Sequence, residues 1–186
     1  MGRQSVGSTG DKCTRANKEK EKVLSFAYLK EHLSYNPDSG TFIWLKSSSD
    51  KIKKGQIAGW NRTRYRVICI KKKFFMAHRV AWLYMVGSWP ALEIDHINGN
   101  TLDNRWSNLR EVTISEQNRN LGLKKTNTSG ICGVYWFKST KSWRAKIDFD
   151  KKQIHLGFYK NFFEACCARK SAERKYGFHV NHGRKR

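Results

Sequence analysis

The sequence predicts an α+β protein made of two small domains that follow each other along the chain. Short apolar runs with the alternation of strands are mixed with segments whose apolar residues recur at helical spacing. A basic, polar stretch at residues 121–126 separates residues 23–120 from residues 127–182. In the second of these segments the pattern predicts a three-stranded antiparallel sheet packed on one helix.

The N-terminal part begins with a predicted tail. Residues 1–22 are mainly Gly, Ser, Lys and Glu with almost nothing to bury, so we expect a disordered basic tail. The elements predicted after it are a helix over 26–33, a turn over 35–40, a strand over 41–45, a hairpin of strands 65–70 and 74–77 joined by lysines 71–73, and a helix over 78–86 closed by Gly87. This part therefore mixes helices with short strands.

Residues 94–118 combine the carboxylate, imidazole and amide side chains that are typical of a catalytic or metal-binding site. Asp95 and His96 follow an apolar approach, so we expect them where a strand ends in a polar loop. Side chains of neighbouring strand residues point to opposite faces, so the carboxylate can reach a metal while the imidazole faces a water. The loop that follows is rich in Asn, Gly and Asp, which is typical of tight connections. Asn108 and a capped helix start at residues 113–118 complete a strand, loop and helix that would bring these side chains together.

These residue types suit the hydrolysis of a phosphodiester. The reaction needs a nucleophile at neutral pH, and a histidine whose pKa lies near the working pH can generate one from water. It also needs neutralisation of the charge on the phosphate and the leaving oxygen, which a hard cation such as Mg²⁺ or Mn²⁺ on oxygen ligands supplies. One carboxylate and one amide make a weak site, so the metal would bind well only when phosphate is present.

Several runs together resemble the HNH endonucleases with the ββα-metal fold, of the free-standing or intron-encoded homing type common in bacteriophages. The runs are HRVAW at 78–82, IDHINGN at 94–100, DNR at 103–105, SNLR at 107–110 and SEQN at 115–118. The resemblance implies that His96 is the general base and that Asp95 binds a divalent metal. It also implies that Asn108 holds the base in orientation.

The resemblance is less direct at the second metal ligand. The family has a His or Asn on the helix nine residues after the orienting Asn, and this chain has Gln117 there, with Asn118 beside it. Glutamine is longer and an uncommon ligand, whereas Asn118 would need a one-residue shift of the helix. We favour Asn118 and keep Gln117 as the alternative. His78, at the start of its helix, could touch phosphate, but we favour a role in capping or packing.

Charge and composition restrict the partner. The chain has 186 residues with 37 Lys and Arg against 15 Asp and Glu, a formal net charge of +22. This excess predicts a polyanionic partner, for which double-stranded DNA is our expectation. A membrane is the rival, but no apolar run approaches the roughly 20 residues that a span needs. We expect no small-molecule substrate and a monomer or weak dimer.

The N-terminus and the cysteines predict a cytoplasmic protein. The first residues are polar and lack a secretory signal, and Val6 misses the myristoylation pattern. The five cysteines show no CxxC pair, which favours free thiols in a reducing compartment over a disulfide framework or a zinc site. Infection of a bacterial host by a phage would provide such a compartment.

The C-terminal part predicts strands at 133–138, 142–148 and 153–159, followed by a helix that Asn161 caps. In the second strand, Trp143, Ala145 and Ile147 alternate with residues of a polar face. The helix, with Ala165, Ala168, Ala172 and Tyr176 on one side, would cover the apolar face. The opposite face then exposes aromatic, basic and amide side chains.

The runs SGxxGVYW, KxWRAKI, IHLGFY and FFEACCARKSAE resemble the ethylene-responsive-factor DNA-binding domain, the Apetala-type domain of plant transcription factors. In that family the sheet face meets the major groove, which implies DNA contacts for Tyr135, Phe137, Arg144, Lys146 and His155. The plant members mostly carry Arg, Glu or Trp at these positions, so their sequence preference does not transfer. The alternative is an ordinary solvated sheet face.

The resulting hypothesis is a metal-dependent DNA endonuclease of the homing type, with a cutting N-terminal domain and a C-terminal domain that binds duplex DNA. Residues 183–186 would be a basic tail. One alternative is a DNA-binding regulator that keeps the HNH fold without activity. Another is an RNA-binding module, since basic strands with exposed aromatics also bind single strands.

Overall fold

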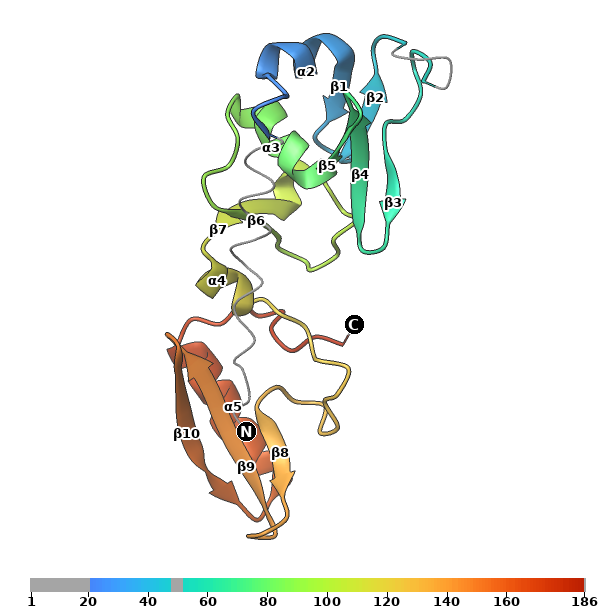
Figure 1. The fold of residues 1–186 in the computed structure, drawn as a ribbon. Coiled ribbons are helices and arrows are strands. Elements are labelled where there is room, and N and C mark those ends of the chain that lie inside the picture. Colours follow the sequence, from blue (N-terminus) through green and yellow to red (C-terminus); the bar gives the residue numbers. More distant parts are fainter. Residues whose placement is uncertain (1–20, 48–51, 186) are drawn as a thin grey trace, which may run out of the picture. The chain divides into compact units, whose positions relative to one another are not determined.

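The computed structural model describes residues 21–47 and 52–185, and shows a mixed α+β protein with small antiparallel sheets (Figure 1). The chain divides into two compact units. The N-terminal unit runs to His96 and also contains Asn100–Leu109. The C-terminal unit contains Ile97–Gly99 and the chain from Arg110 onward. The predicted α+β class is thus confirmed.

The described residues of the N-terminal unit form short strands and short helices. Its elements are α2 (Phe26–His32), β1 (Leu33–Asn36), β2 (Thr41–Trp44), β3 (Trp60–Arg62), β4 (Tyr65–Ile70), β5 (Lys73–Met76), α3 (Ala77–Val86), β6 (Glu93–His96) and the 3₁₀ turn η1 (Trp106–Asn108). β1 pairs with β2, and β3, β4 and β5 form a sheet in that order, all antiparallel. The predicted helices and the β4–β5 hairpin are confirmed.

Two strands of this unit were not predicted. β1 lies where the sequence indicated a helix end and a turn, because the chain becomes extended at Leu33 (φ −132°, ψ 139°) and pairs with β2. β3 pairs with β4 although all of its residues are exposed. The β4–β5 turn is tighter than predicted: Lys71 and Lys72 both have positive φ, as in a type I′ turn, and Lys73 already belongs to β5.

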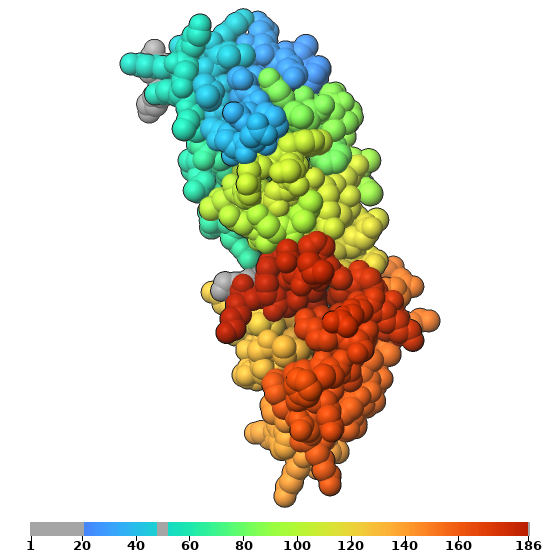
Figure 2. Space-filling view, turned by 180° about the vertical axis from the view of Figure 1, so that it is seen from behind, coloured from blue at the N-terminus to red at the C-terminus, as the bar shows by residue number. Residues whose placement is uncertain are grey.

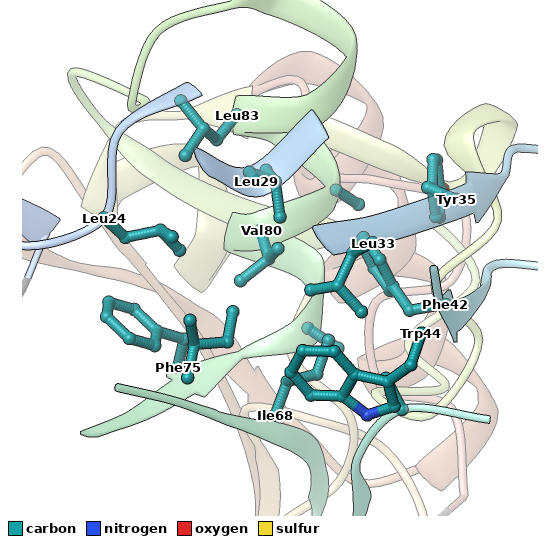
Figure 3. Packing of buried hydrophobic residues seen from close by; sticks show 14 of the residues in the cluster. Leu24, Leu29, Leu33, Tyr35, Phe42, Trp44, Ile68, Phe75, Val80 and Leu83 are labelled. Carbon is teal, nitrogen blue, oxygen red and sulfur yellow. The ribbon is translucent and has the colours of Figure 1, made fainter. Parts of the chain in front are cut away.

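The core of the unit lies between α2, α3 and the strands (Figure 3). Leu29 of α2 and Val80 of α3 are fully buried with Phe42 of β2 and Ile68 of β4. Ile94, the residue before Asp95, belongs to the same cluster. The strand that carries the candidate catalytic residues is thereby fixed to the core on one side.

A buried ion pair ties the start of the described chain to α3. Glu21 Oε1 lies 2.6 Å from Arg79 Nε, and both side chains are 9% exposed. The carbonyl of Glu21 also accepts a hydrogen bond from Trp89 Nε1 at 3.0 Å. Most of the predicted tail, residues 1–20, lies outside the described residues, but Glu21 packs as part of the unit.

The C-terminal unit contains β7 (Leu109–Val112), which starts on the last residue of the other unit, and α4 (Ile114–Asn118). It continues with β8 (Val134–Phe137), β9 (Ser142–Phe149), β10 (Lys152–Tyr159) and α5 (Phe162–Lys175). The sheet has the order β10–β9–β8 and is antiparallel, and α5 lies against it (Figure 1). The predicted sheet and helix are confirmed.

Local sequence explains how α5 begins and which side it buries. The side chain of Asn161 accepts a hydrogen bond from Phe163 N at 2.7 Å and so caps the helix, as predicted. Ala165 is fully buried against the sheet, where Val134 of β8 and Ala145 of β9 supply the other side of the small core. The small side chain of Ala165 lets the helix approach the sheet closely.

The chain after α5 folds back onto its own unit (Figure 2). The N–H of Leu123 donates to the carbonyl of Arg184 at 2.9 Å, and the N–H of Gly183 donates to Leu121 at 2.8 Å. The guanidinium of Arg184 binds the backbone and side-chain oxygens of Asn120 at 2.6 and 3.1 Å. Arg184 and the residue before it are therefore part of the packed structure.

Within the described ranges, no helix combines the length and the apolar character that crossing a membrane requires.

Candidate active site in the N-terminal unit

Strand β6 delivers Asp95 and His96 to the end of a buried strand, as predicted. Glu93 at the start of β6 is half-buried and the three residues after it are buried, with Asp95 and His96 9% and 3% exposed. Ile94 lies in the core cluster, so alternation directs Asp95 away from that core. The carboxylate and the imidazole are thus placed by a rigid strand, with little freedom of their own.

The imidazole of His96 has a partner that sequence reasoning missed. His96 Nε2 lies 3.3 Å from Asn104 Oδ1, and the amide nitrogen of Asn104 donates to the carbonyl of Leu102 at 3.2 Å. Since that amide nitrogen already has its acceptor, Asn104 offers an oxygen to the ring, and Nε2 must be the protonated nitrogen. In the neutral ring the lone pair is then on Nδ1, the atom that can accept a proton from water.

Asn104 is itself held by the fold. It is 2% exposed, and its carbonyl accepts a hydrogen bond from Tyr35 Oη at 2.6 Å. Gly40, at the end of the β1–β2 turn, has φ +69°, and a Cβ there would lie 2.4 Å from the carbonyl carbon of Asn104. Only glycine fits between this turn and the loop without displacing Asn104.

The loop of residues 100–105 is stabilised by its own side chains, as its composition predicts. Asn100 Oδ1 accepts from Leu102 N at 3.1 Å, and Asp103 Oδ1 accepts from Arg105 N at 3.3 Å. Arg105 also binds both carboxylate oxygens of Asp103, at 2.8 and 2.6 Å. Thr101 Oγ1 donates to the carbonyl of Arg64 in the β3–β4 turn.

Asn108 is buried at the end of η1 and is 6% exposed. Its amide nitrogen donates to the carbonyl of Asp103 at 2.8 Å. This contact fixes the loop residue next to Asn104. Asn108 can therefore influence the base through the loop, and its direct role in orienting His96 stays a prediction.

His78 contacts the candidate base. The rings of His78 and His96 are edge-on with centroids 5.0 Å apart, and the ring of Tyr65 lies 5.4 Å from His78 and 6.3 Å from His96. His78 does not cap α3, because the cap position is Met76. Its Nδ1 is buried and has no hydrogen-bond partner among the described residues.

Burial determines the charge of both imidazoles. Desolvation lowers the pKa of His96, although the hydrogen bond with Asn104 and the carboxylates of Asp95 and Asp103 oppose that shift. Desolvation, with the nearby His96 and Arg79, lowers the pKa of His78 further. Both rings are therefore neutral at pH 7, the state that a proton acceptor needs.

The two candidates for the second metal ligand lie on α4, in the other unit. The predicted capping box is confirmed: Thr113 Oγ1 accepts from Glu116 N at 3.3 Å, and Glu116 Oε2 accepts from Thr113 N at 2.8 Å. Gln117 is half-buried and Asn118 is exposed at the last position of the helix. The choice between them stays a prediction.

The donor atoms suit a hard cation. Asp95 supplies a carboxylate oxygen, and Mg²⁺ and Mn²⁺ prefer oxygen ligands of this kind. Within the described residues no three His, Cys, Asp or Glu side chains gather to hold a metal. A cation held by Asp95 would therefore rely on water and phosphate oxygens for most of its ligands.

The five predicted DNA-binding residues lie together on the sheet face of the C-terminal unit. The pairing places Tyr135 opposite Arg144 and Lys146 opposite His155. The Arg144 guanidinium carbon lies 5.9 and 5.8 Å from the ring centres of Tyr135 and Phe137, and its Nε lies 3.4 Å from His155 Nδ1. The face is thus one cluster around a cation.

Phe158 of β10 belongs to the same cluster and was missed by sequence reasoning. Its ring centre lies 5.8 Å from the Arg144 guanidinium and 5.5 Å from the ring of Phe137, and Phe158 is 46% exposed. A register shift between His155 and Gly157 brings Phe158 opposite Arg144, onto the face of His155. Simple alternation along β10 places Phe158 on the other face.

Comparison with known proteins agrees with the geometry of the N-terminal site. Residues 75–119 match the family model described as HNH endonuclease, a range that includes Asp95, His96, Asn108 and both candidates on α4. No solved structure matches the chain significantly. "Protein 3.8" of Escherichia phage T7 is 36% identical over 86 residues, which cover 44% of this chain and 71% of that protein. The chain therefore belongs to the family of this phage protein and carries an HNH endonuclease domain at residues 75–119.

Proposed function

We propose that this protein is a metal-dependent endonuclease that hydrolyses phosphodiester bonds in DNA, of the homing-endonuclease type. The observation that carries the proposal is the buried, neutral imidazole of His96 beside Asp95 at the end of β6, inside the HNH match. His96 is the general base. Its Nε2–H donates to Asn104, and its Nδ1 takes a proton from the attacking water.

Asp95, with Asn118 or Gln117, would hold a divalent cation, Mg²⁺ or Mn²⁺. A bound cation supplies charge neutralisation on the phosphate and the leaving oxygen. Asn108 and Asn104 keep the loop and the base in place through their hydrogen bonds. Placement on β6 and the contact with the buried side chain of Asn104 limit the movement of the His96 ring, so it is preorganised before DNA binds.

Duplex DNA is the proposed substrate, bound in part by the sheet face of the C-terminal unit. The net charge of +22 supports a polyanionic partner. Tyr135, Phe137, Arg144, Lys146 and His155, with Phe158, offer cationic and aromatic groups on one face. Cationic side chains can contact phosphates and base edges, while the aromatic rings contact sugars and thymine methyl groups.

The direct test is cleavage of supercoiled plasmid and of phage or host DNA with Mg²⁺ or Mn²⁺. His96→Ala should abolish cleavage and leave DNA binding, measured by fluorescence anisotropy, unchanged. His32→Ala is the matched control, since His32 belongs to α2 and stacks on Tyr28. Binding without cleavage under every metal condition would instead support a DNA-binding regulator.

The metal ligands need their own comparison. Asp95→Ala should lose cleavage and weaken Mn²⁺ binding measured in the presence of DNA. Asn118→Ala and Gln117→Ala should then differ, with the larger loss marking the ligand. Two variants that both cut at the wild-type rate would exclude both residues.

A further inference from the structure

We propose that the outer face of the β3–β4–β5 sheet is a second DNA-binding surface, which holds the DNA next to the bond that His96 would attack. This inference rests on the proposed nuclease function and assigns part of the substrate contact to the N-terminal unit itself. The surface is separate from the sheet of the C-terminal unit. We call it the β3–β5 face.

Strand register defines the β3–β5 face. Trp60 pairs with Val67 and Val67 with Met76, while Arg62 pairs with Tyr65 and Cys69 with Phe74. Paired residues share a face, and so do residues two apart along a strand. The β3–β5 face therefore consists of Trp60, Arg62, Tyr65, Val67, Cys69, Phe74 and Met76.

The two sides of this sheet differ in burial. The inner side carries Ile68, Ile70 and Phe75, which are 0%, 2% and 5% exposed in the core of the unit. On the outer side, Trp60 and Phe74 remain 47% and 46% exposed, whereas Val67, which pairs with Trp60, is 4% exposed. Strand β3 adds nothing to the core, because all of its residues are exposed. Its contribution to the sheet is the outer surface.

The exposed groups have the chemistry of a nucleic-acid contact. The rings of Trp60 and Phe74 meet edge to face at 5.6 Å with an interplanar angle of 89°. The guanidinium carbon of Arg62 lies 5.7 Å from the centre of the Phe74 ring. Aromatic rings offer surfaces for sugars and bases, and a guanidinium beside them binds phosphate.

Tyr65 connects the β3–β5 face with the candidate active site. It pairs with Arg62 at the end of the sheet, and its ring lies 5.4 Å from the ring of His78 and 6.3 Å from that of His96. The adjoining β3–β4 turn is also held to the catalytic loop, since Arg64 O accepts a hydrogen bond from Thr101 Oγ1. DNA lying along this face would therefore lead to His96.

The positive charge of the chain favours DNA over a second protein copy as the partner of the β3–β5 face. A second copy of the chain would also cover exposed aromatic rings, but each copy carries a formal charge of +22. Bringing two such surfaces together costs electrostatic energy, whereas a polyanion lowers it. Arg62 on the face and Arg64 in the adjoining turn add to the attraction. DNA is the occupant that fits both the rings and the charge.

The test measures DNA binding in a His96→Ala background, so that binding is read without cleavage. Trp60→Ala and Phe74→Ala should each weaken duplex binding, because each removes an exposed ring that can contact a sugar of the DNA. Arg62→Ala should reduce the slope of log K against log salt by about 1. Trp60→Phe should keep most of the affinity, because a ring remains.

Matched controls come from α5. Phe163 is 72% exposed and Arg174 lies in the last turn of α5, so Phe163→Ala and Arg174→Ala remove an exposed ring and an exposed charge elsewhere. Both variants should bind duplex DNA with the same affinity as the His96→Ala parent. If the β3 and β5 variants bind as tightly as these controls, the proposal is wrong. If they instead abolish self-association in sedimentation without affecting DNA binding, the face is a protein interface and the proposal is also wrong.

Failure of this inference can be separated from failure of the nuclease proposal. Oxidative footprinting of the full chain should show Trp60 and Phe74 protected by DNA whether or not the protein cuts. Protection of both rings without any cleavage would support DNA binding by the β3–β5 face and contradict the proposed nuclease activity. If the protein cleaves DNA while Trp60 and Phe74 are still oxidised in the presence of DNA, the nuclease proposal stands and DNA binding by the β3–β5 face is wrong.

Discussion

Asn104 Oδ1 lies 3.3 Å from His96 Nε2, and the same side chain donates to the carbonyl of Leu102. This pair fixes which nitrogen of the ring is protonated. We expect Asn104→Ala to lower kcat on the order of 100-fold, because the ring loses its orientation and tautomer. Affinity for DNA should stay within about twofold, since Asn104 is 2% exposed and contacts the His96 ring rather than solvent.

The variant Asn104→Asp distinguishes loss of the hydrogen bond that positions His96 from loss of folded structure. The carboxylate keeps the acceptor but cannot donate to Leu102, so kcat should fall less than in Asn104→Ala. Circular dichroism and urea unfolding show whether either variant has simply lost structure. Equal kcat in Asn104→Ala and the wild-type protein would mean that the base needs no such partner.

The buried histidines predict lower stability in acid. Burial lowers the pKa of His78 and His96 in the folded state, while in the unfolded chain both have a pKa near 6.5. Above about pH 6.5 both states bind no proton at these rings, and stability does not depend on them. As the pH falls from about 6.5 toward the lowered folded pKa values, the unfolded state binds more protons and the free energy of unfolding decreases.

Urea unfolding between pH 8 and pH 5 measures this loss. His78→Gln carries an amide that does not titrate, so its stability should decline less over the same interval. An identical pH profile in the variant would show that His78 does not contribute.

The Glu21–Arg79 pair should be the most sensitive contact at the start of the described chain. Glu21→Ala leaves the Arg79 guanidinium buried and, among the described residues, next to Glu93 at 4.0 Å and the Leu92 carbonyl at 3.4 Å. We expect a loss of about 3 kcal/mol in the free energy of unfolding, as for other buried pairs that lose one partner. Glu31→Ala, which breaks the exposed pair with Lys46, should change it little. Equal urea midpoints for the two variants would contradict this view.

Arg144 should dominate the sheet face of the C-terminal unit, because it lies among Tyr135, Phe137 and Phe158. Arg144→Ala should weaken duplex binding about tenfold and reduce the salt slope by about 1. Arg174→Ala is the charge-matched control on α5. Affinity equal to that control would place the DNA contact elsewhere.

Sequence analysis predicted those parts of the fold that local chemistry determines. Asn161 caps α5, Thr113 and Glu116 form a capping box, and Gly87 ends α3 in a left-handed conformation. Each signal involves residues within a few positions of one another. The strand position of Asp95 was predicted for the same reason, since Ile94 belongs to the core.

What could not be predicted depends on contacts between distant residues. β3 has no buried residue and exists because it pairs with β4. Asn104 has the local sequence of a turn, and its contact with His96 follows from how the loop closes. Phe158 joins the sheet face around Arg144 only through a register shift in β10. None of these features leaves a periodic signal in the sequence.

The last described residues of the C-terminal unit bear on how the protein should be produced. Asn181 and Asn120 both donate to the carbonyl of Ile97, at 3.0 and 3.3 Å, and the Arg184 side chain lies against Gly99, where a Cβ would be 1.6 Å from Nη2. The segment Ile97–Gly99 directly follows His96 in the chain. Substitution of Asn181 or Arg184, or their removal by proteolysis, would therefore loosen the backbone of Ile97–Gly99, directly after the candidate base His96.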